Sequence, residues 1–317
     1  MTTQTAPASR LDRVFGTPWC AAGFAILCNC LWGSAFPFIK LGYRLFGIDA
    51  ADTASILCFA GARFAIASVW VFLGSCLLQK RPPIFPRGKV LAECCALGLW
   101  QTTLHYGIYY FAVALLTGAF GGILNSTQSF LGVILAHFLY GKADRMTPAK
   151  ALGCAVGFGG VLVATIGNHG GGSALGILYM MTATVMFTFS GPWNKSLTRK
   201  ADSFAACCIN LGFGGVVLFG LGLALGGSLS PQSPLAFGVL LYLSCVSGAA
   251  YLLWALLMKN NPVSRISVFA LVNPVVNVLL SAVLNGEPLF DWRYLGALAL
   301  VCIGIWLVNR PQKKVTV

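Results

Sequence analysis

Three polar side chains recur at four-residue intervals in an otherwise apolar stretch of this sequence. They are Gln101, His105 and Tyr109, with Tyr106 beside them. Residues four apart share one face of an α-helix, so a helix here would carry an amide, an imidazole and phenols along one stripe. Such groups can bind a small amphiphilic molecule by hydrogen bonds and aromatic contacts, or they can tie the helix to its neighbours. The first interpretation predicts a site for a small-molecule substrate.

Other polar and aromatic residues within apolar stretches are candidates for the same site. A polar group inside a bilayer is costly, and it usually either tethers helices or lines a substrate path. The amide candidates are Asn125, Gln128, Asn273 and Asn277. The aromatic candidates are Trp32, Tyr251 and Trp254. Together with the first stripe they predict a central cavity, with ordinary helix packing as the competing interpretation for each residue.

Arg63 is a charged side chain near the middle of an apolar stretch. Placing an arginine at the centre of a bilayer costs at least about 2.5–3.5 kcal/mol. No acidic residue lies at a similar depth, because Glu93 and Glu287 fall near the ends of apolar stretches. Arg63 is therefore expected either to bond helix carbonyls, or to face a wet cavity and bind an anionic group of the substrate.

The composition places these residues in a membrane. Of the 317 residues, 57% are hydrophobic and only 9% are charged, and the mean hydropathy is +0.80. Soluble domains carry about 25% charged residues, so a water-soluble globule is excluded, and so is a disordered chain. A transmembrane helix needs about 20 apolar residues. The chain is long enough for about ten such helices and for no folded domain outside the bilayer.

Apolar runs separated by polar breaks predict an all-α membrane protein with ten transmembrane helices. Their approximate ranges are 19–39, 55–78, 90–112, 116–140, 148–167, 174–194, 203–226, 235–258, 264–285 and 292–309. Seventeen of the 21 Lys and Arg residues then fall on the side that holds both termini, and Lys40, Arg44 and Arg293 fall on the other. Basic loops stay in the cytoplasm, which predicts a cell-membrane protein with both termini cytoplasmic. The net charge of +13 then needs no nucleic-acid partner.

The sequence indicates neither a cofactor nor a metal site. Most of the 12 cysteines lie in apolar runs, and their spacing is not that of zinc ligands. The sequence also lacks the phosphate-binding motif GxxxxGK[ST] and the motifs HExxH and GxSxG. These absences argue against a phosphate-binding glycine loop and against an intramembrane enzyme.

The two halves of the chain resemble each other at an offset of 145 residues. The offset places Tyr106 on Tyr251, Tyr109 on Trp254 and Gln128 on Asn273. Five helices are an odd number, so the second half must enter the membrane from the opposite side. We therefore expect two inverted five-helix repeats related by a pseudo-twofold axis in the membrane plane. The expected divisions are a tail at 1–18, repeats at 19–168 and 169–309, and a tail at 310–317.

Several motifs resemble those of the drug/metabolite transporter superfamily, EamA type. They are Leu31-Trp32-Gly33-Ser34-Ala35-Phe36, Ala62-Arg63-Phe64, Asn273-Pro274-Val275, Gly286-Glu287-Pro288 and Leu295-Gly296-Ala297. The resemblance implies ten helices in two inverted repeats and transport of small metabolites without ATP hydrolysis. The first half departs from the pattern, since Ser129 stands where the family has proline and Gly141-Lys142 where it has glycine-glutamate.

The expected function is that of a secondary transporter in a lipid bilayer, which exports or exchanges an amino acid or related amphiphile by alternating access. An organophosphate or nucleotide-sugar exchanger would need several deep basic groups, and the sequence offers Arg63 alone. A channel or an intramembrane enzyme is a more distant alternative. His105 is the one deep residue that titrates near neutral pH, so a proton-coupled step is the alternative to facilitated exchange. A monomer and a homodimer are both compatible with the sequence.

Overall fold

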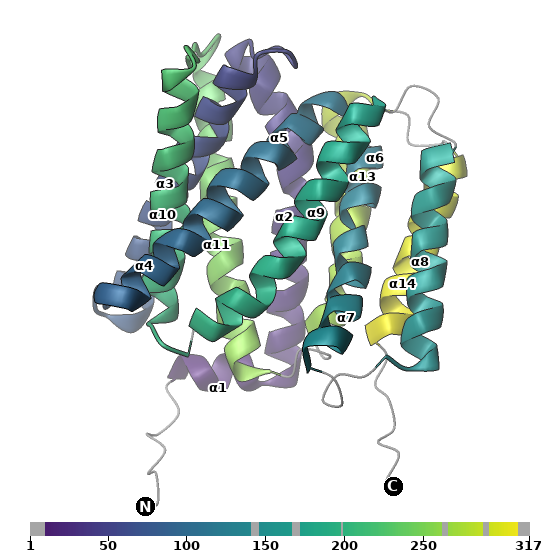
Figure 1. Ribbon diagram of the computed structural model, residues 1–317, viewed down its shortest axis with the longest axis horizontal. Coiled ribbons are helices and arrows are strands. Elements are labelled where there is room, and N and C mark those ends of the chain that lie inside the picture. Colours follow the sequence, from purple (N-terminus) through teal and green to yellow (C-terminus); the bar gives the residue numbers. More distant parts are fainter. Residues whose placement is uncertain are drawn as a thin grey trace, which may run out of the picture.

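The computed structural model describes residues 10–140, 146–166, 172–197, 199–261, 266–287 and 292–309. Within these ranges the fold is helical, without strands apart from one isolated bridge between Leu116 and Gly172. The helices stand side by side in one bundle (Figure 1). The tail 310–317, Gly141-Lys142 and the side chain of Arg293 lie outside the described parts.

The first half of the bundle is made of consecutive helical segments. They are α1 (Arg10–Gly16), α2 (Pro18–Phe46), α3 (Thr53–Gln79), α4 (Gly88–Leu97), the π-helix η1 (Gly98–His105), α5 (Tyr106–Leu115), α6 (Gly118–Asn125), α7 (Thr127–Tyr140) and α8 (Pro148–Ile166). The second half follows in the same manner. Its segments are α9 (Ala174–Leu197), α10 (Ser203–Ala224), α11 (Pro234–Asn260), the 3-10 helix η3 (Ser267–Leu271), α13 (Val272–Asn285) and α14 (Trp292–Asn309).

Each predicted apolar range coincides with one of these helices or with segments that follow one another. Seven helices of the described chain are long and apolar enough to cross a membrane, and two shorter apolar helices follow at Phe269–Asn285 and Tyr294–Asn309. The third predicted range contains α4, η1 and α5, which follow without a break. Apolar side chains cover the outside of the bundle, for example Val69, Leu178 and Val216, which are each more than half exposed. This surface is that of an integral membrane protein.

Two features differ from the sequence expectation. Helix α2 continues to Phe46, so Lys40 and Arg44 lie on its last turns instead of in a loop. It ends where Gly47 adopts the left-handed conformation, with φ 64°, which glycine accepts without steric cost. Within the expected N-terminal tail, α1 forms a short helix because its Phe15 is buried and stacks on Phe24 at 4.5 Å.

Helices α3 and α10 pack against each other through glycine. Gly61 of α3 lies against Phe219, and Gly215 of α10 lies against Phe64 and Ala65. Residue numbers rise along one helix as they fall along the other, so the pair is antiparallel. Glycine lets the two backbones approach closely, and close packing is a main source of helix association in lipid.

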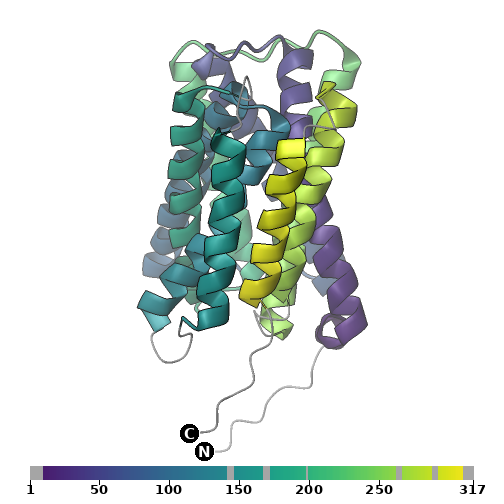
Figure 2. The ribbon, with the colours of Figure 1, turned by 90° about the vertical axis from the view of Figure 1, so that its right-hand side faces the viewer.

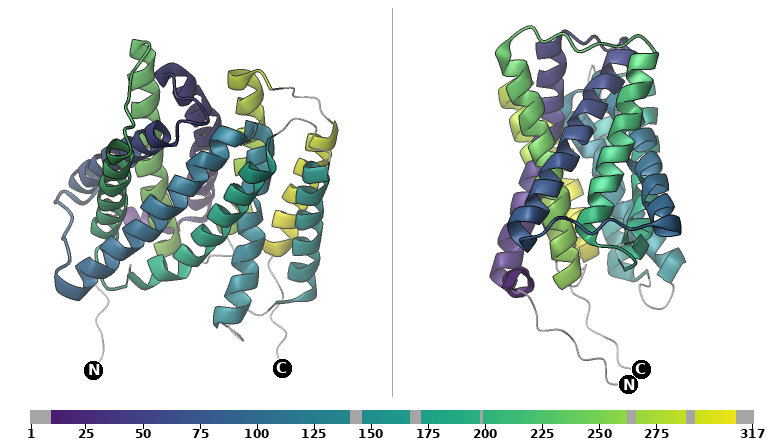
Figure 3. Two further views of the ribbon diagram at one scale, coloured as in Figure 1. Left: turned by 45° about the horizontal axis from the view of Figure 1, so that its top comes forward. Right: turned by 90° about the vertical axis from the view of Figure 1, so that its left-hand side faces the viewer.

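Helices α8 and α14 form a second antiparallel pair at the opposite edge of the bundle (Figures 1 and 2). Gly153 of α8 lies against Val308, whereas Gly160 lies against Ala297. Figure 3 shows this pair at one edge and α3 and α10 at the other, with α2, α5, α9 and α11 between them. The described chain begins at α1 and ends at α14 at the same end of the bundle, which we call the near end (Figure 1).

The α8–α14 contact makes Gly304→Ala a test of this packing. A Cβ at Gly304 would lie 2.7 Å from both the Gly153 carbonyl oxygen and the Gly157 Cα, and backbone atoms cannot yield as a side chain can. We expect the free energy of unfolding to fall by about 1–3 kcal/mol, read as a lower melting temperature in detergent. Gly296→Ala on the same helix is the control, because nothing lies within 4 Å of that Cβ. Equal melting temperatures for the two variants would contradict the packing.

Candidate functional site

The third membrane segment changes its helical register at the predicted polar stripe. Residues 98–105 form a π-helix, in which backbone bonds join residues five apart, so side chains five apart lie above one another. Gln101 Nε2 lies 3.3 Å from the Tyr251 hydroxyl, and the Tyr106 hydroxyl lies 2.8 Å from the same oxygen. Gln101 and Tyr106, five residues apart, therefore converge on one partner of α11, a pairing that the four-residue spacing did not predict.

Gln101 also joins two residues that the sequence analysis missed. Its Oε1 accepts a hydrogen bond from Asn210 Nδ2 at 2.8 Å and one from Asn194 Nδ2 at 3.5 Å. Asn210 Oδ1 in turn accepts from the Thr102 hydroxyl at 2.7 Å. The network thus links η1 to α9, α10 and α11. Asn210 could have been found, because it is the one amide side chain in the apolar run 203–226.

The aromatic candidates meet next to this network. The Trp32 ring lies 6.2 Å from the Tyr251 ring and 5.2 Å from the Trp254 ring, centroid to centroid. Tyr109 makes an edge contact with Phe36 at 6.1 Å. Aromatic pairs at such distances are stabilised by about 0.5–1.5 kcal/mol beyond their buried area. The rings therefore form an apolar wall beside the amide and hydroxyl groups.

His105 lies within the same cluster. Its Nδ1 is 3.0 Å from the carbonyl oxygen of Gln101, and a carbonyl can only accept, so Nδ1 carries the hydrogen of this bond. Its ring lies 4.4 Å from that of Tyr106 and 5.1 Å from that of Phe187, and only 4% of the residue is exposed. The imidazole is thus held in one orientation, with Nε2 left as the group that could meet a ligand or a proton.

Arg63 is buried and bonds neutral acceptors on two helices. Its Nε donates to the Leu243 carbonyl oxygen at 3.1 Å and to the Ser247 hydroxyl at 2.9 Å. Its Nη1 donates to the Tyr110 hydroxyl at 2.6 Å, and the guanidinium lies 5.1 Å from the Phe64 ring centroid. No described residue bonds Nη2. Arg63 therefore connects α3 to α5 and α11 and still has donors for an anionic group.

The four predicted amides of α6, α7 and α13 do not join this cluster by hydrogen bonds within the described chain. Asn277 is 2% exposed, and its Oδ1 lies against Gly122 without a hydrogen-bond partner in the described residues. The Asn273 backbone carbonyl packs against Gly33. The side chains of Asn125 and Gln128 are partly buried and bond no other described residue. The structure thus separates the predicted site into a bonded cluster and a second group of amides.

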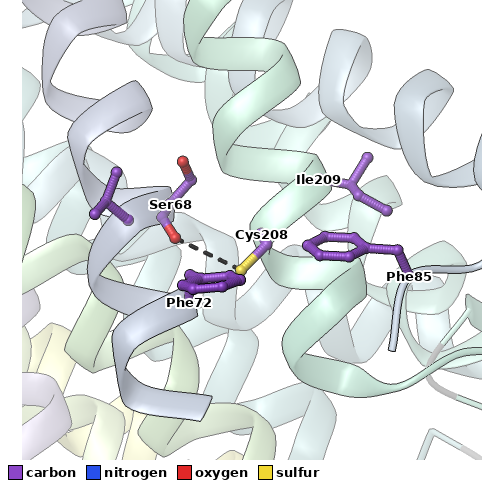
Figure 4. Close-up of a pocket in the computed structure, with 6 residues that line it drawn as sticks. Ser68, Phe72, Phe85, Cys208 and Ile209 are labelled. Atoms are coloured by element: carbon purple, nitrogen blue, oxygen red, sulfur yellow. Dashed lines mark hydrogen bonds between the residues drawn. The ribbon is translucent and has the colours of Figure 1, made fainter. Parts of the chain in front are cut away.

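An apolar hollow of about 320 Å³ lies between α3, α10 and the segment before α4. Figure 4 shows its lining by Ser68, Phe72, Phe85, Cys208 and Ile209, with the Cys208 thiol 3.5 Å from the Ser68 carbonyl oxygen. It contains none of the predicted site residues and no charged side chain. This lining offers a polar substrate no orienting group, so the candidate site remains the cluster around Gln101 and Tyr251.

Known proteins similar to this chain are transporters by name. It is 28% identical to an uncharacterized transporter of Archaeoglobus fulgidus, over 89% of this chain and 95% of that protein. It is 27% identical to the uncharacterized inner membrane transporter YedA of Escherichia coli K12, over 90% of each. It is 23% identical to a probable terminal-alkyne amino-acid exporter of Streptantibioticus cattleyicolor, over 90% of this chain and 92% of that protein.

A solved crystal structure shares the fold. It superposes with a TM-score of 0.64 at 19% identity, over 89% of this chain and 95% of that one. The model of the EamA-like transporter family matches the sequence twice, at residues 19–166 and at residues 174–310. We call these two matched segments the first and second halves. The chain therefore belongs to the EamA-like transporter family.

Proposed function

We propose that the protein is a secondary carrier that exports or exchanges an amino acid or a related amphiphile by alternating access. The observation that carries this proposal is the contact of 2.8 Å between the hydroxyls of Tyr106 and Tyr251. The two tyrosines are equivalent at the 145-residue offset between the halves. Two equivalent atoms can meet only beside the axis that relates their halves. The contact therefore supports a substrate site at the junction of the halves, where inverted-repeat carriers bind their cargo.

The antiparallel helix pairs support two inverted five-helix repeats at 19–168 and 169–309. The pair α3 and α10 corresponds to the second and seventh predicted spans, and α8 and α14 correspond to the fifth and tenth. Equivalent helices beside a twofold axis in the membrane plane must run antiparallel. Both pairs do so, and the tyrosine contact lies on helices between them (Figure 1). The axis we propose crosses the bundle from one edge to the other.

The chemistry of the cluster favours a substrate with one carboxylate and an apolar part. Trp32 and Trp254 offer apolar faces, and Arg63 is the one deep cation of the described chain. A single guanidinium matches one carboxylate, whereas a phosphate carries up to two charges. The name of one relative, a probable amino-acid exporter, supports the same class. We propose that Asn125, Gln128, Asn273 and Asn277 line the side of the path next to α6 and α13.

Exchange in vesicles tests the carrier mechanism. Purified protein in proteoliposomes loaded with unlabelled amino acid should accumulate the labelled amino acid faster than empty vesicles do, because a loaded carrier returns faster than an empty one. The measurement is uptake against time for a panel of amino acids, with a sugar phosphate as the organophosphate alternative. Uptake that is linear in concentration and indifferent to internal substrate would instead indicate a channel.

The variant Tyr251→Phe tests the polar cluster. It removes the hydroxyl that Gln101 and Tyr106 share, and the loss of two hydrogen bonds should lower transport at subsaturating substrate by about tenfold. Tyr242→Phe is the matched control on α11. It also removes a tyrosine hydroxyl, but one that bonds the Ser34 hydroxyl at 2.7 Å and lies outside the cluster. Equal transport rates in both variants would remove the cluster from the substrate path.

The variant Arg63→Lys separates the two roles of Arg63. Lysine keeps the charge but cannot bond Tyr110 and α11 together, so we expect the ligand-free protein to lose about 1.5–3 kcal/mol of stability. Thermal unfolding without substrate measures this, with the exposed Arg87→Lys as the control. An unchanged melting temperature combined with weaker carboxylate binding would assign Arg63 to the substrate alone.

A further inference from the structure

Glu287 connects the second half of the chain to a helix of the first half. Its Oε1 accepts a hydrogen bond from the backbone N–H of Gly118 at 2.6 Å, and its Oε2 accepts one from that of Ala119 at 2.9 Å. These are the first two residues of α6. The carboxylate therefore caps a helix that belongs to the other half.

This cap is strong for two physical reasons. The first N–H groups of a helix have no partner within the helix, and the aligned peptide dipoles place partial positive charge there. A carboxylate that accepts two of these N–H groups makes charge-assisted bonds, which are roughly twice as strong as neutral ones. The preceding residue Thr117 makes no side-chain cap of its own. Glu287 thus supplies what the local sequence of α6 lacks.

Two aspartates cap helices of their own half, although Asp202 Oδ2 also meets Ile84 N at 3.5 Å and Arg81 at 3.6 Å in the first half. Asp52 accepts from Ser55 N at 3.0 Å at the start of α3, and Asp202 accepts from Phe204 N at 2.9 Å at the start of α10. Each of them stabilises the helix that follows it directly. Only the Glu287 bonds must break when α6 moves relative to the end of α13.

Arg44 makes a second connection between the halves at the same place. Its Nη2 donates to the Leu284 carbonyl oxygen at 3.0 Å and to Asn285 Oδ1. Asn285 and Glu287 line a pocket of about 400 Å³ together with Lys40, Arg44 and Thr117. We call Arg44, Asn285, Glu287 and the first turn of α6 the far-end clasp. The last turns of α2 and α13 and the start of α6 lie at the end of the bundle opposite the near end (Figure 1).

Glycine allows the clasp to close. A Cβ at Gly118 would collide with Ser281 Oγ of α13 and would lie 3.2 Å from Glu287 Oε1. The first turn of α6 therefore rests directly on the Ser281 side chain of α13, with no side chain of its own between them. The backbone N–H groups reach the carboxylate because of this close approach.

We propose that Glu287 is a positioning residue of the transport cycle: its bonds to α6 hold the far end of the carrier closed, and their release opens it. This rests on the proposed function, since it requires the two halves to move against each other. Glu287 does not touch substrate in this role. It sets the balance between the state open at the far end and the state open at the near end.

Hydrogen exchange of the full-length protein in lipid nanodiscs, measured by mass spectrometry without substrate, tests this proposal. In Glu287→Gln the peptides covering residues 117–124 should exchange at least several-fold faster, because one N–H bond and the charge are lost. Peptides at the near end, from α7 and the last turns of α9, should exchange more slowly, because alternating access closes one end as the other opens. The matched control is Asp52→Asn, which changes a cap within one half and should leave the near end unchanged.

Arg44→Gln keeps the proposal testable if Glu287→Gln folds poorly. It cuts the connection between α2 and the end of α13 and leaves the α6 cap in place. We again expect faster exchange in residues 117–124 and slower exchange at the near end. Faster exchange in α6 without slower exchange at the near end, in both variants, would reduce Glu287 to a local cap and overturn the proposal. The proposed function fails differently, through absence of exchange transport in vesicles, and neither readout depends on the other.

Discussion

Polar groups at the middle of a bilayer have no water to bond, so each must find its partner in the protein. In this protein several of the partners come from the other half of the chain. Gln101 and Tyr106 of the first half share the Tyr251 hydroxyl of the second, and Gln101 also bonds Asn210. The need of these polar groups for hydrogen-bond partners therefore brings amide, phenol and imidazole groups together between the two halves. Neither half could satisfy this cluster alone.

Arg63 is subject to the same need for hydrogen-bond partners within the protein. Its charge has no carboxylate partner among the described residues, and it is held by one carbonyl and the hydroxyls of Tyr110 and Ser247. Neutral acceptors stabilise a guanidinium without cancelling its charge, so the junction remains positive. A substrate carboxylate would find there a field that no fixed anion has neutralised. Tethering and binding are thus compatible roles for one side chain, because a guanidinium carries five N–H donors.

The sequence allowed the helices to be predicted well and the site only in part. Apolar length and polar breaks located the long apolar helices but not the short α1, since the bilayer demands long apolar helices whatever their neighbours. The contacts within the site depended on features that periodicity does not carry. The π-helical segment brings Gln101 and Tyr106, five residues apart, to one partner, and Asn210 gained its role through the packing of α10 against η1. Lys40 and Arg44 joined α2 because its C-terminal cap lies at Gly47.

The two halves have kept some symmetric features and lost others. Tyr106 and Tyr251 are the same residue type and their hydroxyls meet at 2.8 Å, so a loss of the Tyr251 hydroxyl would leave that of Tyr106 without its partner. Glu287 aligns at the same offset with Lys142, which lies outside the described residues, and an ammonium group cannot accept an N–H bond. The chemistry of the Glu287 cap is therefore available to one repeat and not to the other. This chemical difference between the two ends suits the proposed carrier, whose two open states need not be equally stable.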